Sequence, residues 1–99
     1  MSSIKRRLAA IVFTDVAGFT DLSAKDEEGA YKLLKKQRKV LKPIVSKHEG
    51  EWLKEGGDGL LLSFPSTKEA VNCSIKIQES VQNIDALNLR IGIHQGDVI

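Results

Sequence analysis

Apolar side chains along this chain change their spacing several times, between every second residue and about every 3.6 residues. The shorter spacing indicates a strand and the longer one an amphipathic helix, so the changes divide the chain into alternating elements. With 99 residues, the chain has the length of a single domain with one core. The sequence therefore predicts one small domain that mixes strands and helices.

Strands are predicted at residues 8–16, 51–55, 60–64 and 87–94. The first is almost continuously apolar, which is typical of a strand buried on both faces. The second and third flank Gly56-Gly57-Asp58-Gly59, a cluster that indicates a hairpin turn. Helices are predicted over residues 26–48, where Pro43 should kink the helix or remove a hydrogen bond, and from a Ser or Thr cap at residues 66–67 to about Asn83.

The resulting order, βαββαβ, predicts the ferredoxin-like arrangement: an α+β fold with a four-stranded antiparallel sheet and two long helices on one face. A right-handed crossover makes the first two strands parallel, and the hairpin strand inserts between them. Asp15 ends the first strand and Asp58 lies in the hairpin turn. We therefore expect these two carboxylates to meet at one edge of the sheet.

Asp15 and Asp58 are the candidate metal ligands. Asp15 taken alone could simply cap a short helix that begins near Gly18. A pair of carboxylates is different, because no Arg or Lys is expected between them and they would repel unless they shared cations. Two Mg²⁺ ions fit such a pair, since Mg²⁺ takes oxygen ligands and leaves positions open for phosphate.

The turn after Asp15, residues 16–20, reads Val-Ala-Gly-Phe-Thr and leads into the start of a helix. Its backbone amides would favour an anion such as a polyphosphate, although Gly18 could equally serve only the turn. Together with a metal pair, this turn predicts a site for a nucleoside triphosphate.

Composition and charge exclude several classes of partner. Lys and Arg number 15 against 13 Asp and Glu, too small a surplus to indicate a nucleic acid. The chain has a single cysteine, Cys73, and no apolar stretch long enough to span a bilayer. We expect these residues to contact no membrane and to lie in the cytoplasm, with a membrane tether elsewhere in a longer parent left open.

Three segments resemble successive motifs of the class III adenylate and guanylate cyclase catalytic domain. They are residues 13–20 (Phe-Thr-Asp-Val-Ala-Gly-Phe-Thr), 54–59 (Lys-Glu-Gly-Gly-Asp-Gly) and 90–96 (Arg-Ile-Gly-Ile-His-Gln-Gly). Their order and spacing match from about Arg7 to Ile99, which is more specific than a lone glycine pattern. The resemblance implies that residues 1–99 are the N-terminal part of one such domain, truncated at its C-terminus.

The resemblance also implies roles for individual residues. Asp15 and Asp58 would bind two Mg²⁺ or Mn²⁺ ions, with the carbonyl of Val16 as a further ligand. The β- and γ-phosphates would be held by the backbone amides of Ala17, Gly18, Phe19 and Thr20. One ion would lower the pKa of the ribose 3′-hydroxyl that attacks the α-phosphorus, and the other would neutralise the departing pyrophosphate.

Lys54 occupies the position at which adenylate cyclases carry the lysine that reads adenine, whereas guanylate cyclases typically carry Glu there. A lysine donates hydrogen bonds and cannot accept them, which suits adenine N1. The resemblance thus implies ATP as substrate and cyclic AMP as product. Without the neighbouring motif, Lys54 would read as an ordinary exposed strand lysine.

In this family an Asn and an Arg from a later segment complete the site across a head-to-tail homodimer. The resemblance thus implies that the full-length parent is an enzyme, a phosphorus–oxygen lyase. Because neither the Asn nor the Arg lies in this chain, the 99 residues alone are expected to be inactive. Its fourth strand should lie at an uncovered sheet edge, which predicts a dimer or higher oligomer that need not reproduce the parent's interface.

Two other readings stay open from the residues. A diguanylate cyclase carries a Gly-Gly-Asp-Glu-Phe hairpin, whereas here Asp58 is followed by Gly59 and Leu60. A non-catalytic ferredoxin-like module could bind nucleotide or a protein partner without turnover. An Asn-x-x-x-Arg segment downstream would favour catalysis over the binding module.

Overall fold

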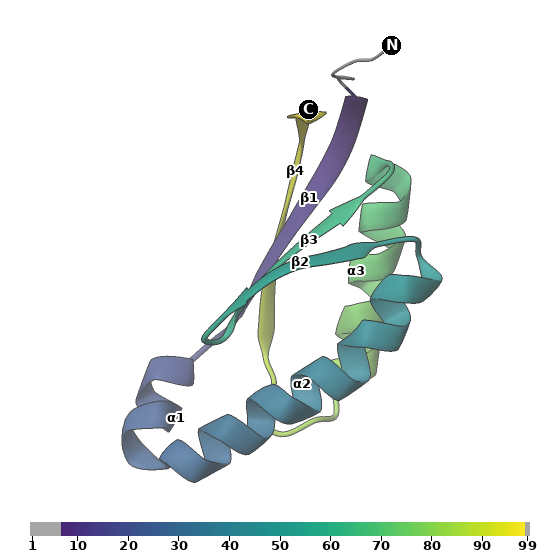
Figure 1. The fold of residues 1–99 in the computed structure, drawn as a ribbon. Coiled ribbons are helices and arrows are strands. Elements are labelled where there is room, and N and C mark those ends of the chain that lie inside the picture. Colours follow the sequence, from purple (N-terminus) through teal and green to yellow (C-terminus); the bar gives the residue numbers. More distant parts are fainter. Residues whose placement is uncertain (1–6, 99) are drawn as a thin grey trace.

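The computed structural model describes residues 7–98 of the chain (Figure 1). In order, the elements are β1 (Arg7–Val16), α1 (Phe19–Lys25), α2 (Glu27–Lys47), β2 (Glu51–Gly56), β3 (Gly59–Phe64), α3 (Thr67–Val81) and β4 (Leu89–Val98). The predicted βαββαβ order is confirmed, with the short helix α1 added between β1 and α2.

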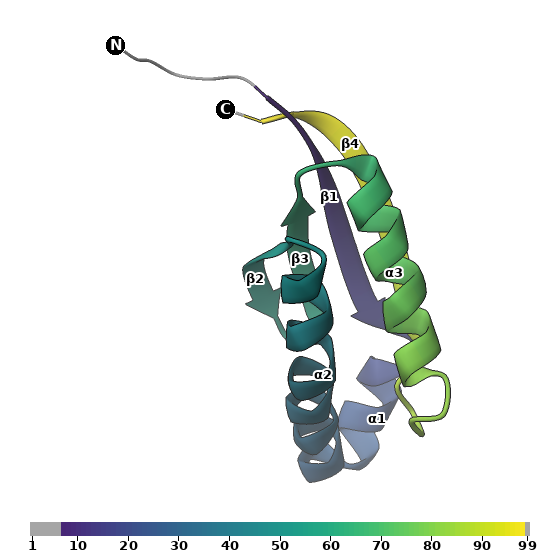
Figure 2. The same ribbon diagram turned by 90° about the vertical axis from the view of Figure 1, so that its right-hand side faces the viewer.

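The four strands form one sheet in the order β2-β3-β1-β4, and every neighbouring pair is antiparallel. Because β3 is antiparallel to both β1 and β2, those two strands are parallel, as the crossover rule predicts. Helices α2 and α3 lie side by side on one face of the sheet (Figures 1 and 2). The predicted ferredoxin-like α+β fold is confirmed.

Both long helices begin at a side-chain cap, which the sequence predicted for α3 and did not predict for α2. The Asp26 carboxylate accepts a hydrogen bond of 2.9 Å from the Gly29 amide at the start of α2. The Ser66 hydroxyl accepts one of 3.2 Å from the Glu69 amide at the start of α3. Each such cap stabilises a helix by about 1 kcal/mol. Helix α2 continues through Pro43 to Lys47 without interruption.

The core lies between the two long helices and the face of the sheet that they cover. Helix α3 contributes the fully buried Cys73 and Ile77, and α2 contributes Leu41. The strands contribute Leu62 and Phe64 from β3. Burial of each large apolar side chain is worth roughly 1.5–3 kcal/mol, so this layer holds the sheet to the helices. Among the described residues, no helix is both long and apolar enough to cross a membrane.

The prediction that β1 is buried on both faces is wrong. Ala10 and Val12 are fully buried, but Phe13 is 52% exposed and Ile11 is only partly covered. The helices cover one face of the sheet, so alternate side chains of β1 point to the opposite, open face. A nearly continuous apolar run is therefore compatible with a strand that is covered on one side.

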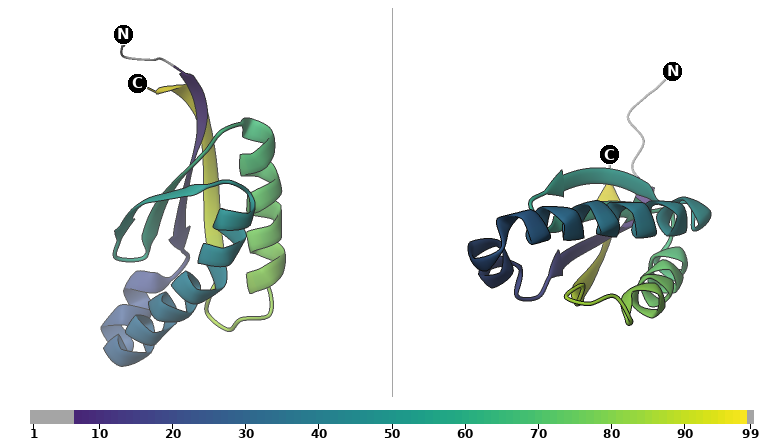
Figure 3. Two further views of the ribbon diagram at one scale, coloured as in Figure 1. Left: turned by 45° about the vertical axis from the view of Figure 1, so that its right-hand side comes forward. Right: turned by 90° about the horizontal axis from the view of Figure 1, so that it is seen from below.

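Strand β4 begins two residues later than predicted and continues to Val98. Its ladder with β1 runs from Arg7 opposite Val98 to Val16 opposite Leu89, so β1 supplies a partner along its whole length. The N-terminal end of β1 and the C-terminal end of β4 consequently lie together (Figure 3). Within residues 7–98, β4 pairs with β1 alone, which confirms its predicted position at an edge.

Gly50 offers a test of the packing between the helices and the sheet. A Cβ atom at this position would lie 2.5 Å from the Phe64 ring and 2.7 Å from the Val45 side chain, both of which are buried. We expect Gly50→Ala to lower the free energy of unfolding by about 1–3 kcal/mol through overpacking. Gly56→Ala is the matched control, because a Cβ there would meet nothing within 4 Å. Chemical denaturation of both variants measures the difference, and equal stability would contradict this packing.

Candidate functional site

Asp15 and Asp58 line the same hollow, at the end of the sheet from which α1 departs. Asp15 is the last residue but one of β1, and Asp58 lies in the turn that joins β2 to β3. The hollow has a volume of about 340 Å³. The structure therefore brings together the two carboxylates that the topology led us to expect at one edge.

A direct hydrogen bond fixes Asp58 against the end of β1. Its Oδ2 accepts a bond of 2.9 Å from the backbone amide of Val16. Gly57, the other residue of the turn, adopts a left-handed backbone conformation with φ 57° that favours glycine. Oδ1 of Asp58 has no hydrogen-bond partner in the part of the chain that the structure describes. Asp58 is thus held in place by one oxygen and offers the other.

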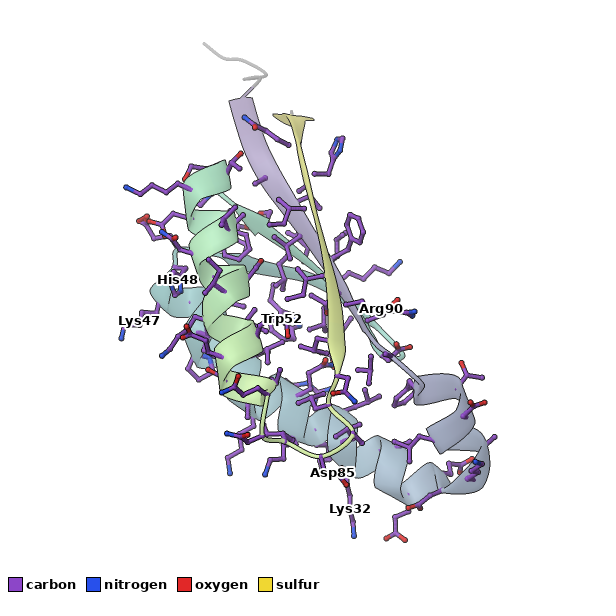
Figure 4. The ribbon with its side chains drawn as sticks, turned by 180° about the vertical axis from the view of Figure 1, so that it is seen from behind. Lys32, Lys47, His48, Trp52, Asp85 and Arg90 are labelled. Atoms are coloured by element: carbon purple, nitrogen blue, oxygen red, sulfur yellow. The ribbon has the colours of Figure 1, made fainter. Side chains whose placement is uncertain are left out.

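The expectation that no Arg or Lys lies between the carboxylates is wrong. Arg90 of β4 stands directly opposite Asp15 of β1. Its Nε donates to Asp15 Oδ1 at 2.6 Å and its Nη2 donates to Asp15 Oδ2 at 3.1 Å. Figure 4 shows Arg90 at the end of the sheet beside α1. The motif patterns did not reveal this pair, because it depends on the register between β1 and β4, and the two residues lie 75 positions apart in the sequence.

The hydrogen bond to Asp15 and the charge of its carboxylate raise the pKa of Arg90 above its usual value, and the charge of Asp58 adds to the effect. Arg90 therefore lies in the electrostatic field of both carboxylates. Its side chain is nevertheless 69% exposed, and that of Asp15 is 45% exposed. The pair is a surface ion pair with good geometry, not a buried one.

The residues of the turn after Asp15 differ in their hydrogen bonds and in whether they line the hollow. The amide of Ala17 donates a 2.8 Å hydrogen bond to the Asn88 carbonyl, so it is already satisfied within the fold. Gly18 adopts φ 77° and caps α1, with no side-chain hydrogen bond at that cap. Asp15 thus does not cap this helix. Of the four residues whose amides were predicted to hold phosphate, Gly18, Phe19 and Thr20 line the hollow and Ala17 does not.

Two further features of this turn bear on the site. The Phe19 side chain packs against the core, in keeping with a packing role. Asp21, in the first turn of α1, lines the same hollow and was missed from the sequence. Asp21 follows Gly18 in the run Phe-Thr-Asp, and this closeness to the predicted phosphate-binding turn could have indicated it.

The donor set fits a hard divalent cation that shares its coordination with a ligand. Between Arg7 and Val98, no three His, Cys, Asp or Glu side chains gather closely enough to hold a metal by themselves. The hollow provides the carboxylates of Asp15 and Asp58, and Val16 also lines it. Mg²⁺ is commonly held by one or two carboxylates together with the phosphates of a substrate.

Lys54 does not line this hollow, but it shares the open face of the sheet with Asp15. A β-bulge at Leu53 shifts the register, so that Trp52 pairs with Leu62 and Lys54 pairs with Leu61. Leu61 also stands opposite Phe13, whose side chain lies on the open face. Directly opposed residues share a face, so the bulge turns Lys54 to the open face. Regular alternation would have turned it toward the helices.

Glu55 confirms this reading of the bulge, because its side chain points to the helices. It accepts hydrogen bonds from Arg38 of α2, the shortest at 2.6 Å, and one of 3.2 Å from Trp52 Nε1. Lys42 of α2 lies 5.2 Å from the centre of the Trp52 ring. These contacts tie β2 to α2 and hold the strand that carries Lys54.

The chain matches the family model described as the adenylate and guanylate cyclase catalytic domain over residues 3–99. It is 38% identical over 105 residues to a protein of Rhizobium meliloti (strain 1021) named "Putative adenylate cyclase 3". That match covers 98% of the chain and 18% of the relative.

Two solved structures share the fold. The guanylyl cyclase Cya2 superposes with a TM-score of 0.84 at 25% identity, over 95% of this chain and 56% of that one. A bacterial light-regulated adenylyl cyclase gives a TM-score of 0.87 at 23% identity, over 97% of this chain and 57% of that one. The chain thus spans little more than half of these solved chains and about a fifth of the curated relative.

The Arg38–Glu55 pair predicts a dependence of stability on pH. The hydrogen bond from Arg38 is the main cause that lowers the pKa of Glu55 below its usual value. A lowered pKa in the folded state means that the pair stabilises the fold above the unfolded value of about 4.3. That stabilisation is lost as the pH falls through the lower, folded value.

We therefore expect Glu55→Gln to lower the melting temperature by a few degrees at most at pH 7, and the gap to the parent to close below about pH 4. Glu51→Gln, on an exposed residue of the same strand, is the control. Thermal unfolding followed by circular dichroism measures both series. A gap that stays constant down to pH 2 would show that the ion pair is not its cause.

Proposed function

Because the chain belongs to the adenylate and guanylate cyclase catalytic domain family, we propose that it forms the N-terminal part of a domain that converts ATP to 3′,5′-cyclic AMP and pyrophosphate. The observation that carries this proposal is the hollow shared by Asp15, Asp58 and the first turn of α1. A nucleoside triphosphate requires carboxylates that bind its cations and, beside them, backbone amides that bind its phosphates.

Asp15 and Asp58 are the proposed ligands of two Mg²⁺ or Mn²⁺ ions, with the carbonyl of Val16 as a further oxygen. Such ions, when bound, lower the pKa of an attacking hydroxyl and neutralise the charge of a departing pyrophosphate. The protein's part is to hold its carboxylates in place. The bond between Asp58 Oδ2 and the Val16 amide does so for Asp58 and leaves Oδ1 to accept a cation.

The amides of Gly18, Phe19 and Thr20 are the proposed contacts of the β- and γ-phosphates. Ala17 is removed from this set, because its amide already donates to Asn88. The first amides of a helix have no partner within the helix and point out of its N-terminal end. A polyphosphate in the hollow would satisfy them and would lie next to the cation ligands.

Lys54 is the proposed contact of the adenine ring. It is exposed and lies on the open face of the sheet, the same face as Asp15. A lysine suits the acceptor N1 of adenine, whereas guanine presents a donor at that position. This residue favours ATP over GTP, although the similar structures include both adenylyl and guanylyl cyclases.

The proposed partner is a second catalytic domain in a head-to-tail homodimer, which would supply an Asn and an Arg to the site. Without those residues, the 99-residue chain is expected to make no cyclic nucleotide. The outer edge of β4, with the exposed Ile93 beside Val71 and Ile75 of α3, is the surface through which copies of this chain are expected to associate.

The first functional test replaces the carboxylates in the full-length parent. Asp15→Asn and Asp58→Asn should each lower kcat for cyclic AMP formation by several orders of magnitude, because a neutral amide binds a divalent cation poorly. Asp85→Asn removes the same charge from the exposed loop between α3 and β4 and should change kcat less than about twofold. Near-normal turnover in either site variant would refute the assignment of the cation ligands.

The second functional test addresses the base. Lys54→Glu in the parent should shift the ratio of kcat/KM for ATP and GTP toward GTP by at least about tenfold, the value of one hydrogen bond to a charged group. Lys47→Glu makes the same charge reversal at the exposed end of α2 and should leave the ratio unchanged. A ratio that is the same in both variants would show that Lys54 does not read the base.

A further inference from the structure

Asp15 differs from Asp58 in one respect that matters for a cation. Both of its carboxylate oxygens accept hydrogen bonds from Arg90, at 2.6 Å and 3.1 Å. Asp58 has one oxygen held by a backbone amide and the other without a partner among the described residues. In this structure one oxygen of Asp58 is therefore open to a cation, whereas both oxygens of Asp15 already bind another positive group.

We infer that Arg90 and a divalent cation compete for the carboxylate of Asp15, so that the ion pair holds Asp15 in the cation-free state and opens when a cation binds. This inference rests on the proposed function, because it takes Asp15 as a cation ligand. It assigns to Arg90 the role of a positioning residue that acts through Asp15.

The surroundings of Arg90 allow this exchange. Its side chain is 69% exposed and extends from β4, an edge strand, over the open face of the sheet. No buried contact has to break when the guanidinium moves away. Arg90 also lines the hollow itself, so a released guanidinium would remain beside Asp58 and the start of α1.

The exposure of the pair also limits the size of the effect. Ion pairs between exposed side chains are generally weak, because water screens them and two long side chains lose freedom. Arg90 should therefore weaken cation binding about two- to fivefold and not prevent it. The effect should shrink as salt is added, since salt screens an exposed pair.

The first experiment titrates Mn²⁺ into the 99-residue chain without nucleotide and measures the dissociation constant by calorimetry or electron paramagnetic resonance. Arg90→Gln should bind Mn²⁺ about two- to fivefold more tightly than the parent at low salt. Arg38→Gln is the matched control, because Arg38 forms a similar two-pronged pair with Glu55 away from the hollow. Its affinity should equal that of the parent.

A second measurement separates competition from a general effect of charge, because it follows the bond between Arg90 and Asp15 itself. The Nε–Hε resonance of Arg90, assigned by its loss in Arg90→Gln, reports the bond to Asp15. Titration with Mg²⁺ should move this signal toward that of a free arginine, and Asp15→Asn should move it there without Mg²⁺. The Arg38 signal should not change.

The outcomes distinguish the inference from the function on which it rests. If Mg²⁺ saturates the Val16 and Asp58 amide signals while the Arg90 signal stays in place, the competition is refuted and the cation site stands. Equal Mn²⁺ affinity of the parent and Arg90→Gln would refute it in the same way. If neither protein binds Mn²⁺ at millimolar concentration, both the competition and the proposed cation site are overturned.

Discussion

The antiparallel pairing of β1 with both of its neighbours determines everything else at the candidate site. Its ladder with β3 brings the hairpin turn to the end of β1, where the Val16 amide holds Asp58. Its ladder with β4 sets Arg90 opposite Asp15. A slip of one residue would turn Asp15 to the helix-covered face and separate it from Arg90. The core side chains of β1, Ala10 and Val12, oppose such a slip because it would expose them.

The topology and the meeting of Asp15 with Asp58 could be predicted because both follow from local signals. Hydrophobic spacing indicated each element, a Ser or Thr cap at residues 66–67 indicated the start of α3, and the crossover rule fixed the order of the strands. The contact between Asp15 and Arg90 could not be predicted in the same way. It requires the register of β4, and a motif read along the chain contains no information on which residue of another strand stands opposite.

The β-bulge at Leu53 is the second feature that the sequence did not reveal. Period-two alternation alone would place Lys54 on the same face as Trp52, which packs against the core. The extra residue reverses that assignment and also turns Glu55 to Arg38 of α2. One inserted residue thus decides both which face Lys54 occupies and how β2 is tied to the helix layer. The Ala17 amide is a comparable case, since only the folded structure shows that it donates a hydrogen bond to the Asn88 carbonyl.

The open face of the sheet connects these parts through Phe13 and a glycine. Phe13 stands opposite Leu61 on one side and Gly92 on the other, between the strand of Lys54 and the strand of Arg90. A Cβ atom at Gly92 would lie 2.4 Å from the Phe13 ring, so the ring lies against the β4 backbone where only glycine leaves room. Any larger residue at this position would push the ring outward over the face that Lys54 and Asp15 share. The glycine in Arg-Ile-Gly-Ile-His therefore acts at a distance from the carboxylates: it sets the position of the aromatic ring on the open face, two residues along β1 from Asp15.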